Sequence, residues 1–427
     1  MNLNKELKNN LEIKLKENRD RYLKVLKDLV KLDTRVVGHG IDGGYELKGQ
    51  QYLENLIKEL GGKAEYVEMK EEKIQEAIEK YNEGNPGHNY EDRPNLVGEF
   101  SGSGDGRSLI LNGHIDTMPY GEKEMWEHDP FLGEKIDGNI YGLGSCDMKG
   151  GLAASLLAVD LIQSAGYKLK GDVLFESVVD EEGGGNGTLG LVQEGYKADG
   201  AVICEPTSLD LQVGHMGFIF YKIGVKGKSL HSSQKWRGVN AIKKAIKLIN
   251  ALEEMEHNWL MKYKHPLMPP PTLNIGVIKG GEAGSTVPSN CEFKLCLHYY
   301  PGLEKEKIQN DVEQALNNVV QGDPWLKENP LEIEIYQEGS PYEISKEHDL
   351  VKTFQKYIPE DKEITASPAG NDARLLQNIS KTPTIIYGPG YPEDAHSIDE
   401  KISIDQYIDS ILSYAEFIAD WCGIERS

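Results

Sequence analysis

The chain lacks the features that mark secreted, membrane-spanning and nucleic-acid-binding proteins. It has only five cysteines among 427 residues, and no two of them form a CxxC pair. An odd number of scattered cysteines argues against a disulfide framework and against a zinc site built from thiolates. No apolar run approaches the roughly 18 to 20 residues that a membrane-spanning helix needs, and the charged N-terminal segment has no apolar signal core. We therefore expect a cytoplasmic protein with no membrane partner.

Positive charge is scarce as well. Lys and Arg number 47 against 69 Asp and Glu, which gives a formal net charge of -22. A chain this acidic repels phosphate backbones, so nucleic acid is not an expected partner. The proportion of hydrophobic residues, 39%, is that of a globular protein, and the length allows a large core divided over two or three domains.

Short apolar strands alternate with helices through much of the chain. Amphipathic helices are predicted at residues 5–32 and about 45–60, and a helix of small residues at 150–166. Strands are predicted in the segments AEYVEM, NLVGEF, SLILNGHID, GDVLFESVVD and GAVICEP. This alternation predicts an α/β fold whose mostly parallel sheet is flanked by helices. Residues 71–95 are predicted to form a polar surface excursion, and SGSGDGRS at 101–108 a hairpin turn.

The pattern changes after Glu205. Residues 216–338 contain, in order, a strand, a helix, two strands, a helix and a strand. This order is that of a compact ferredoxin-like α+β module. The segments PTIIYGPG and DQYIDSILSYAEFIADWC then resume the earlier alternation of strand and helix. We therefore predict a catalytic domain formed by residues 1–215 and 339–427 and interrupted by an inserted module at 216–338.

Two polar residues, His114 and Asp116, end a predicted strand in SLILNGHID. Residues two apart in a strand share a face, so their side chains are expected to touch. A carboxylate that holds one imidazole nitrogen turns the other toward a metal ion. Taken alone, the pair is better explained as a polar turn, and Asp147 in YGLGSCDMKGG as a helix cap or turn residue.

Further acids and a histidine follow other predicted strands. The carboxyl ends of parallel strands meet at one edge of a sheet, where α/β folds bind ligands. Two histidines and three carboxylates gathered there would suit zinc, cobalt or manganese, and a bridging carboxylate would allow two ions about 3.5 to 4 Å apart. The repulsion within VVDEEGGGNG is tolerable only beside divalent cations, and its glycines lack the GK[ST] ending of a phosphate loop. The residues that converge in this way are His114, Asp147, Asp180, Glu181, Glu182, Glu205 and His396.

In this order, the motifs resemble those of the dinuclear zinc metallopeptidase and amidohydrolase family that includes acetylornithine deacetylase, succinyl-diaminopimelate desuccinylase, aminoacylase and glutamate carboxypeptidase. The match spans nearly the whole chain. It rests on a histidine in the inserted module and on GHID, WEHDPF, DGNIYGLGSCDMKGG, DEEGG, CEPT, GNDARLL and DAHSIDE.

The resemblance implies two zinc ions per subunit, with cobalt or manganese as alternatives. His114, Asp147 and Glu205 would hold one ion. The second ion would be held by Glu182, His396 and the bridging Asp147. Asp116 would orient His114, and Glu181 would act as general base on the attacking water, while Asp180 is left without a defined role.

The resemblance also implies that the inserted module acts as a lid and joins two chains into a homodimer. His231 in KGKSLHSSQ would donate a hydrogen bond to the tetrahedral oxyanion, across the dimer in many relatives. His298 stands where many relatives carry an arginine that grips a substrate carboxylate. Asn371 and Arg374 lie in the segment matching the family's substrate loop, and Arg374 is expected either to clamp an anion or to pair with Asp372.

The function that fits best is metal-dependent hydrolysis of the amide bond of a small N-acyl amino acid or amine, with an acetyl, formyl or succinyl group, as in acetylornithine deacetylase. Among the members of this family, the sequence pattern over the whole chain looks most similar to that of bacterial deacylases of this type and of formylaminopyrimidine deformylases. A metallo-dipeptidase or carboxypeptidase would use the same metal ligands. A non-catalytic, metal-dependent binding protein is the alternative outside the enzymes. The presence of Glu181 and of all five expected ligands argues against it.

Overall fold

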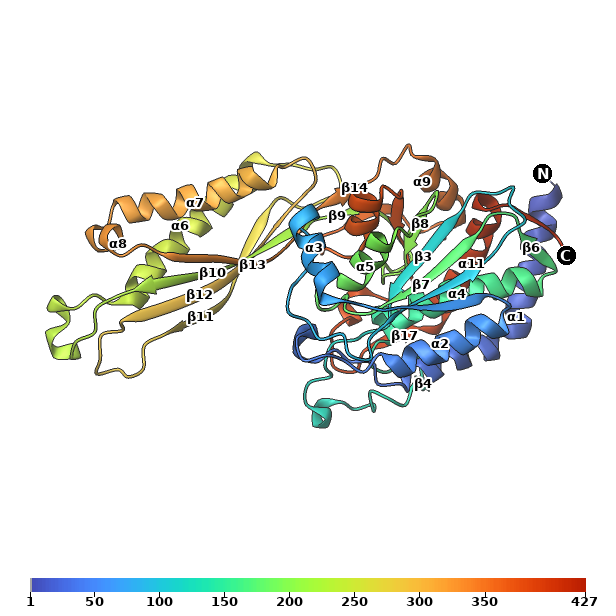
Figure 1. The fold of residues 1–427 in the computed structure, drawn as a ribbon, viewed down its shortest axis with the longest axis horizontal. Helices are drawn as coiled ribbons and strands as arrows, with labels where there is room; N and C mark the ends of the chain where they lie inside the picture. The colour runs from blue at the N-terminus through green and yellow to red at the C-terminus, as the bar shows by residue number, and fades with distance from the viewer. Residues whose placement is uncertain (1) are drawn as a thin grey trace. The chain divides into compact units, whose positions relative to one another are not determined.

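The computed structural model describes residues 2–427 and divides into two compact units (Figure 1). Unit 1 comprises the residues up to Gly214 together with Ile344–Ala366 and Asn371–Ser427. Unit 2 comprises His215–Glu343 and the short segment Ser367–Gly370. None of the helices in the described part of the chain is long and apolar enough to span a membrane.

A twisted sheet forms the centre of unit 1, and its middle strands are parallel. β7 and β8 flank β3 in parallel, and β16 pairs in parallel with β8. The flanking strands β1, β2 and β9 are antiparallel to their neighbours. This arrangement confirms the predicted α/β class with a largely parallel sheet. Seven of the nine strands of this sheet are, in spatial order, β1 (Lys63–Val67), β2 (Asn95–Phe100), β7 (Val173–Val178), β3 (Leu109–His114), β8 (Ala201–Ile203), β16 (Thr384–Ile386) and β9 (Leu211–His215).

Helices cover both faces of this sheet. Gly113 on β3 faces Leu152 of α4 (Gly150–Ser164), whereas the preceding residue, Asn112, bonds Thr188 of α5 (Asn186–Glu194). Because neighbouring residues of a strand point to opposite faces, α4 and α5 lie on opposite sides. Both α1 (Asn2–Val30) and α11 (Ile404–Trp421) pack against α4, and α2 (Leu47–Glu59) packs against β1 and β2.

The start of α4 lies against the end of β8 because Gly151 has no side chain. A Cβ atom at Gly151 would lie 1.8 Å from the main-chain oxygen of Cys204, so no other residue fits without moving the backbone. The loop that precedes α4 is thereby brought beside Glu205, which follows β8.

One local prediction was wrong. SGSGDGRS at 101–108 is no hairpin turn, because β7 lies between β2 and β3 in the sheet. The segment at 71–95, predicted as a surface excursion, begins with a helix that the sequence did not indicate, α3 (Glu71–Tyr81), which buries Ile74 and Ala77 and packs against α5. The sequence did not indicate this helix because charged residues greatly outnumber the few apolar residues of its buried face.

Unit 2 has the β-α-β-β-α-β order expected from the sequence. Its four antiparallel strands lie in the spatial order β11-β12-β10-β13. Leu248 and Leu252 on one helix and Ile308 and Val312 on the other pack into one core with the sheet. The elements are β10 (Gly217–Lys226), α6 (Ala241–Lys262), β11 (Thr272–Gly280), β12 (Asn290–Tyr299), α7 (Lys305–Gln321) and β13 (Glu332–Gly339).

A buried ion cluster holds the chain just before Glu181. The Arg93 guanidinium donates to Glu46 Oε1 at 2.9 and 2.6 Å and to Asp180 Oδ1 at 3.1 Å. All three side chains are fully buried. His88 Nδ1 lies 2.7 Å from the other oxygen of Asp180. The sequence left Asp180 without a defined role, and the structure makes it an anchor for the turn that follows β7.

Replacement of Arg93 by methionine tests this cluster. The Arg93→Met change leaves Glu46 and Asp180 buried without their cation, so we expect a loss of about 3 to 5 kcal/mol in the free energy of unfolding. The measurement is urea unfolding at neutral pH, followed by tryptophan fluorescence.

Arg19→Met is the matched control, because Arg19 pairs with Asp405 at 3.4 Å on the surface. Its loss should stay below about 1 kcal/mol. Equal losses in the two variants would contradict the anchoring role of Arg93.

Candidate metal centre

Two groups of metal-binding side chains meet at the carboxyl ends of the central strands of unit 1. The first group is His114, Asp147 and Glu205, and the second is Asp147, Glu182 and His396. In each group, one ligand atom from every residue lies within 4.8 Å of the others. The structure therefore brings together all five residues that the sequence suggested as ligands, and Asp147 belongs to both groups.

The two carboxylate oxygens of Asp147 face different histidines. His114 Nε2 lies 3.1 Å from Oδ1, and His396 Nε2 lies 3.3 Å from Oδ2. Around them, Glu205 Oε1 is 3.8 Å from His114 Nε2, and Glu182 Oε1 is 3.0 Å from His396 Nε2. One carboxylate thus has one oxygen in each group, which is the arrangement a bridging ligand needs.

Main-chain contacts set the direction of the His114 ring. Its Nδ1 lies 2.8 Å from the main-chain oxygen of Asp116, which leaves Nε2 directed at Asp147. The Asp116 carboxylate, which the sequence suggested for this task, is 3.8 Å from Nδ1. It instead accepts the main-chain N–H groups of Glu181 and Glu182 at 3.3 and 3.1 Å. Asp116 therefore orients His114 through its carbonyl and holds the Glu181–Glu182 turn through its carboxylate.

The acids of the site carry charge that burial disfavours. Burial, with the nearby Asp372 carboxylate, raises the pKa of Glu181 well above its usual value. Burial and the charge of Asp147 do the same to the pKa of Glu205. Hydrogen bonds to Asp147 and Glu182 raise the pKa of His396 to about 11. Positive charge is therefore strongly favoured at this position.

The donor set fits a divalent cation such as zinc. Two imidazole nitrogens and three carboxylates are ligands of the type that zinc, cobalt and manganese accept in proteins. A cation in either group would replace the protons that the histidines otherwise hold between the carboxylates. Both the geometry and the charge of these residues therefore fit a divalent cation.

Glu181 lies beside the two groups without belonging to either. Its Oε2 is 4.0 Å from His114 Nε2, and its side chain remains 16% exposed. It is thus close enough to the cation positions to contact a molecule held there, yet it is not needed as a ligand.

The residues of unit 1 suggested for substrate binding make contacts within the fold. Arg374 is nearly fully buried, and it donates to Glu83 Oε2 at 3.0 Å and to the main-chain oxygens of Asn371 and Gly184. The Arg374 guanidinium is therefore paired within the fold, which disfavours the expectation that it clamps a substrate anion. The Asn371 side chain caps the next turn by accepting the N–H of Ala373 at 3.0 Å.

Both histidines proposed for catalysis or recognition outside the cluster belong to unit 2. His231 is exposed, and its Nδ1 lies 2.7 Å from the Ser233 hydroxyl. His298 lies on β12 with Nε2 3.4 Å from Cys296 Sγ, and burial lowers the pKa of its imidazole. A neutral imidazole at this position would replace the permanent charge of an arginine.

Glu400 contacts the site, although the sequence pattern did not indicate it. This buried acid ends the motif DAHSIDE, and its carboxylate accepts main-chain N–H groups from the loop that carries Asp147. The available signal was an acid four residues after a proposed histidine ligand, but spacing along the chain cannot reveal a contact with a loop more than 250 residues away.

A cavity of about 200 Å³ borders the second group. Tyr120 and Trp126 line it together with Asp147, Glu182 and His396, and its described lining contains neither lysine nor arginine. Trp126 Nε1 donates to the main-chain oxygen of Tyr120 at 2.8 Å, which fixes the two aromatic residues relative to each other. The wall beside the second group is therefore aromatic and uncharged.

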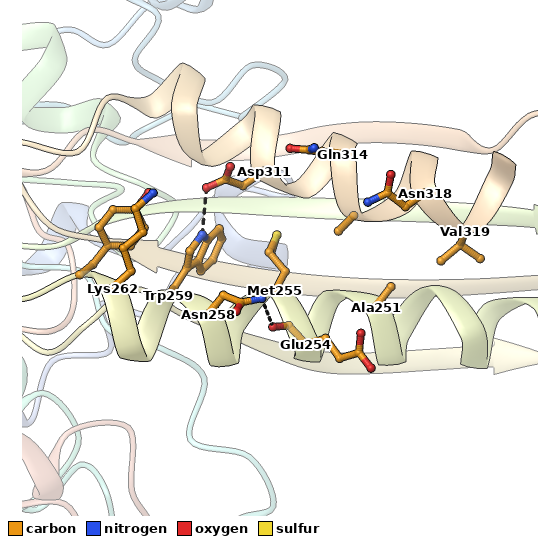
Figure 2. A pocket seen from close by; sticks show the side chains of 12 residues that line it. Ala251, Glu254, Met255, Asn258, Trp259, Lys262, Asp311, Gln314, Asn318 and Val319 are labelled. Carbon is orange, nitrogen blue, oxygen red and sulfur yellow. Dashed lines mark hydrogen bonds between the residues drawn. The ribbon is translucent and has the colours of Figure 1, made fainter. Parts of the chain in front are cut away.

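A larger cavity of about 500 Å³ lies wholly within unit 2, between α6 and α7 (Figure 2). Trp259 forms part of its floor and donates a hydrogen bond to Asp311 at 3.0 Å. Both metal-binding groups found among the described residues lie in unit 1, so the smaller cavity is the one that borders the reactive side chains.

The chain is similar to a known family and to proteins of known activity. The family model for peptidase family M20/M25/M40 matches residues 110–420. The N-formyl-4-amino-5-aminomethyl-2-methylpyrimidine deformylase of Halalkalibacterium halodurans is 34% identical over 365 residues, which cover 79% of this chain and 85% of the relative. The acetylornithine deacetylase of Vibrio atlanticus is 29% identical over 408 residues, covering 94% of this chain and 98% of the relative.

Solved structures show the same fold. An M20 family metallo-carboxypeptidase from Sulfolobus solfataricus superposes with a TM-score of 0.71 at 20% identity, covering 93% of this chain and 98% of that one. A di-peptidase from Saccharomyces cerevisiae gives a TM-score of 0.74 at 15% identity, covering 97% and 98%. Since the family model spans most of the chain and the deformylase exceeds 30% identity, the chain belongs to peptidase family M20/M25/M40.

Proposed function

We propose that this protein hydrolyses the amide bond of a small N-acyl amine at a centre that holds two divalent cations, with zinc as the native metal. The observation that carries the proposal is the pair of Asp147 oxygens, each facing a different histidine, with Glu181 beside both groups and part of neither. The deformylase and acetylornithine deacetylase relatives, both named for removal of an N-acyl group, support the reaction class.

The roles of the residues follow from their positions. His114, Asp147 and Glu205 would hold one cation, and Asp147, Glu182 and His396 the other. When bound, the cations polarise the amide carbonyl and lower the pKa of water. Glu181 would take the proton of the attacking water and pass it to the leaving amine.

The Tyr120–Trp126 wall favours a substrate with an uncharged group beside the second cation position. A cavity of about 150 Å³ is large enough to hold benzene, so a space of about 200 Å³ accommodates one planar ring or a short acyl chain. A substrate that placed a carboxylate there would find no lysine or arginine in the described lining. We therefore favour a formyl or acetyl amide over a succinyl amide or a peptide with a free carboxylate.

We also propose that unit 2 joins two chains into a homodimer through β11 and that His231 assists the reaction by donating to the oxyanion. β11 is an edge strand of its sheet, and it exposes Val277 and Ile278. An exposed apolar edge strand is a ready site for pairing with a second copy of itself. The exposed side chain of Ile246 on α6, which packs against β11, extends the apolar surface.

A substrate panel tests the reaction. With zinc supplied, we expect turnover of formyl and acetyl amides of neutral aromatic amines to exceed turnover of succinyl amides and dipeptides. Glu181→Gln should bind zinc as the native chain does and lose about 10²- to 10⁴-fold in kcat, because the proton acceptor is gone. No amide hydrolysis anywhere in the panel would contradict the proposed function, and full activity of Glu181→Gln would contradict its role as base.

Asp147→Ala tests the bridge. Both groups lose an oxygen ligand in this variant, so zinc uptake at both positions should weaken, as measured by metal analysis after equilibrium dialysis. Glu205→Ala is the control, because it removes a ligand from the first group alone. Two tightly held zinc ions in Asp147→Ala would rule out the bridging role.

Ile278→Lys tests the interface. A lysine in the middle of β11 should separate the dimer into single chains, measured by size-exclusion chromatography with light scattering. Ile333→Lys is the control on β13, the other edge strand of this sheet, where the native isoleucine is also exposed. The β11 interface would be wrong if Ile278→Lys stayed dimeric, or if Ile333→Lys alone became monomeric.

A further inference from the structure

Glu400 is a buried acid that neither metal-binding group includes. It is 2% exposed and lies four residues after His396. Its Oε2 accepts the N–H of Gly144 at 2.8 Å, and its Oε1 accepts the N–H groups of Cys146 and Asp147 at 2.9 and 3.0 Å. One carboxylate thus satisfies three main-chain donors of the loop that presents Asp147, which is a strong form of hydrogen bonding because the acceptor is charged.

The main chain around Glu400 is anchored to the same loop by separate contacts. The main-chain oxygen of Glu400 accepts the N–H of Gly142 at 2.8 Å. The next residues form β17 (Lys401–Ser403), which pairs antiparallel with β5 (Asn139–Tyr141). The position of Glu400 is therefore set by backbone pairing before the Asp147 loop, and its side chain reaches across to the loop itself.

The two groups depend on this contact to different degrees. In the first group, His114 ends β3 and Glu205 follows β8, two paired central strands of the sheet. In the second group, His396 belongs to the same loop segment as Glu400, and it is half exposed with a left-handed backbone at φ 53°. A loosened Glu400 side-chain contact would release the Asp147 loop from the His396 segment, whereas His114 and Glu205 would stay in place on their paired strands.

We propose that Glu400 is a positioning residue that fixes the Asp147 loop against the His396 segment and so sets the cation affinity of the second group. The role rests on the proposed metal centre. Glu400 acts through Asp147 and His396, since both its oxygens are occupied by main-chain N–H groups. Partners of this kind, which hold metal ligands in place, change metal affinity by about 10- to 100-fold when removed.

Glu400→Gln tests the proposal by changing one atom. The amide oxygen can still accept at the Oε1 position, but the NH₂ group would then face the N–H of Gly144, donor against donor. Glu393→Gln is the control, because it removes the same charge from an exposed position on the same segment. The measurement is zinc uptake by the metal-free full chain in competition with a chromophoric chelator, which resolves the first and second ions without any substrate.

We expect native protein and Glu393→Gln to take up two zinc ions alike, and Glu400→Gln to bind the second ion about 10- to 100-fold more weakly with a smaller change at the first. Glu400→Asp, which keeps the charge on a shorter side chain, should be intermediate and serves if the amide variant does not fold. Unchanged uptake in Glu400→Gln, or equal weakening of both ions, would overturn this role alone. Native protein that binds fewer than two ions would overturn the proposed centre and this role with it.

Discussion

Negative charge gathered at the carboxyl ends of β3, β7 and β8 is the constraint on which the rest of unit 1 depends. Asp147, Glu181, Glu182 and Glu205 converge there, and only His114 and His396 offset them among the residues of the two groups. Carboxylates this close together raise one another's pKa unless positive charge lies between them. The surrounding structure must therefore hold acids near one another against repulsion until a cation binds, and it does so with contacts that do not use the ligand atoms.

The acids that hold the site in place differ from the acids that face the cation positions. Asp116 and Glu400 accept main-chain N–H groups of the two turns that carry the ligands, and Asp180 receives the guanidinium of Arg93. Each of these three acids is buried, and its carboxylate accepts hydrogen bonds from the backbone or from an arginine. The ligand acids, by contrast, keep oxygens free to face the histidines. Neighbouring acids in the same motif thus differ in role because their partners differ.

The sequence predicted the convergence but not these partners. Residues that follow separate parallel strands must meet at one edge of the sheet, so His114, Glu182 and Glu205 could be brought together from their positions alone. Spacing cannot say which acceptor a histidine uses, and the carbonyl of Asp116 takes the place expected for its carboxylate. Nor can it find Glu83, which binds Arg374 from 291 residues away, or the insertion of β7 between β2 and β3. These features are decided by tertiary packing, which a local pattern does not carry.

Three arginines of unit 1 are each paired with an acid of the same unit, and this bears on what the site can select. Arg93 binds Glu46 and Asp180, Arg374 binds Glu83, and Arg35 binds Asp33 while its guanidinium lies 4.5 Å from the centre of the Tyr120 ring. Arg35 therefore has an acid partner and an aromatic contact within the fold, and it is not among the described residues that line the cavity. The described lining of this cavity has no lysine or arginine, so the positive charge that a substrate would meet there would come from the proposed cations or, without them, from a protonated His396. Under the proposed function, a cation would attract any amide carbonyl equally, so the choice among acyl amides would fall to the size and neutrality of the Tyr120–Trp126 wall.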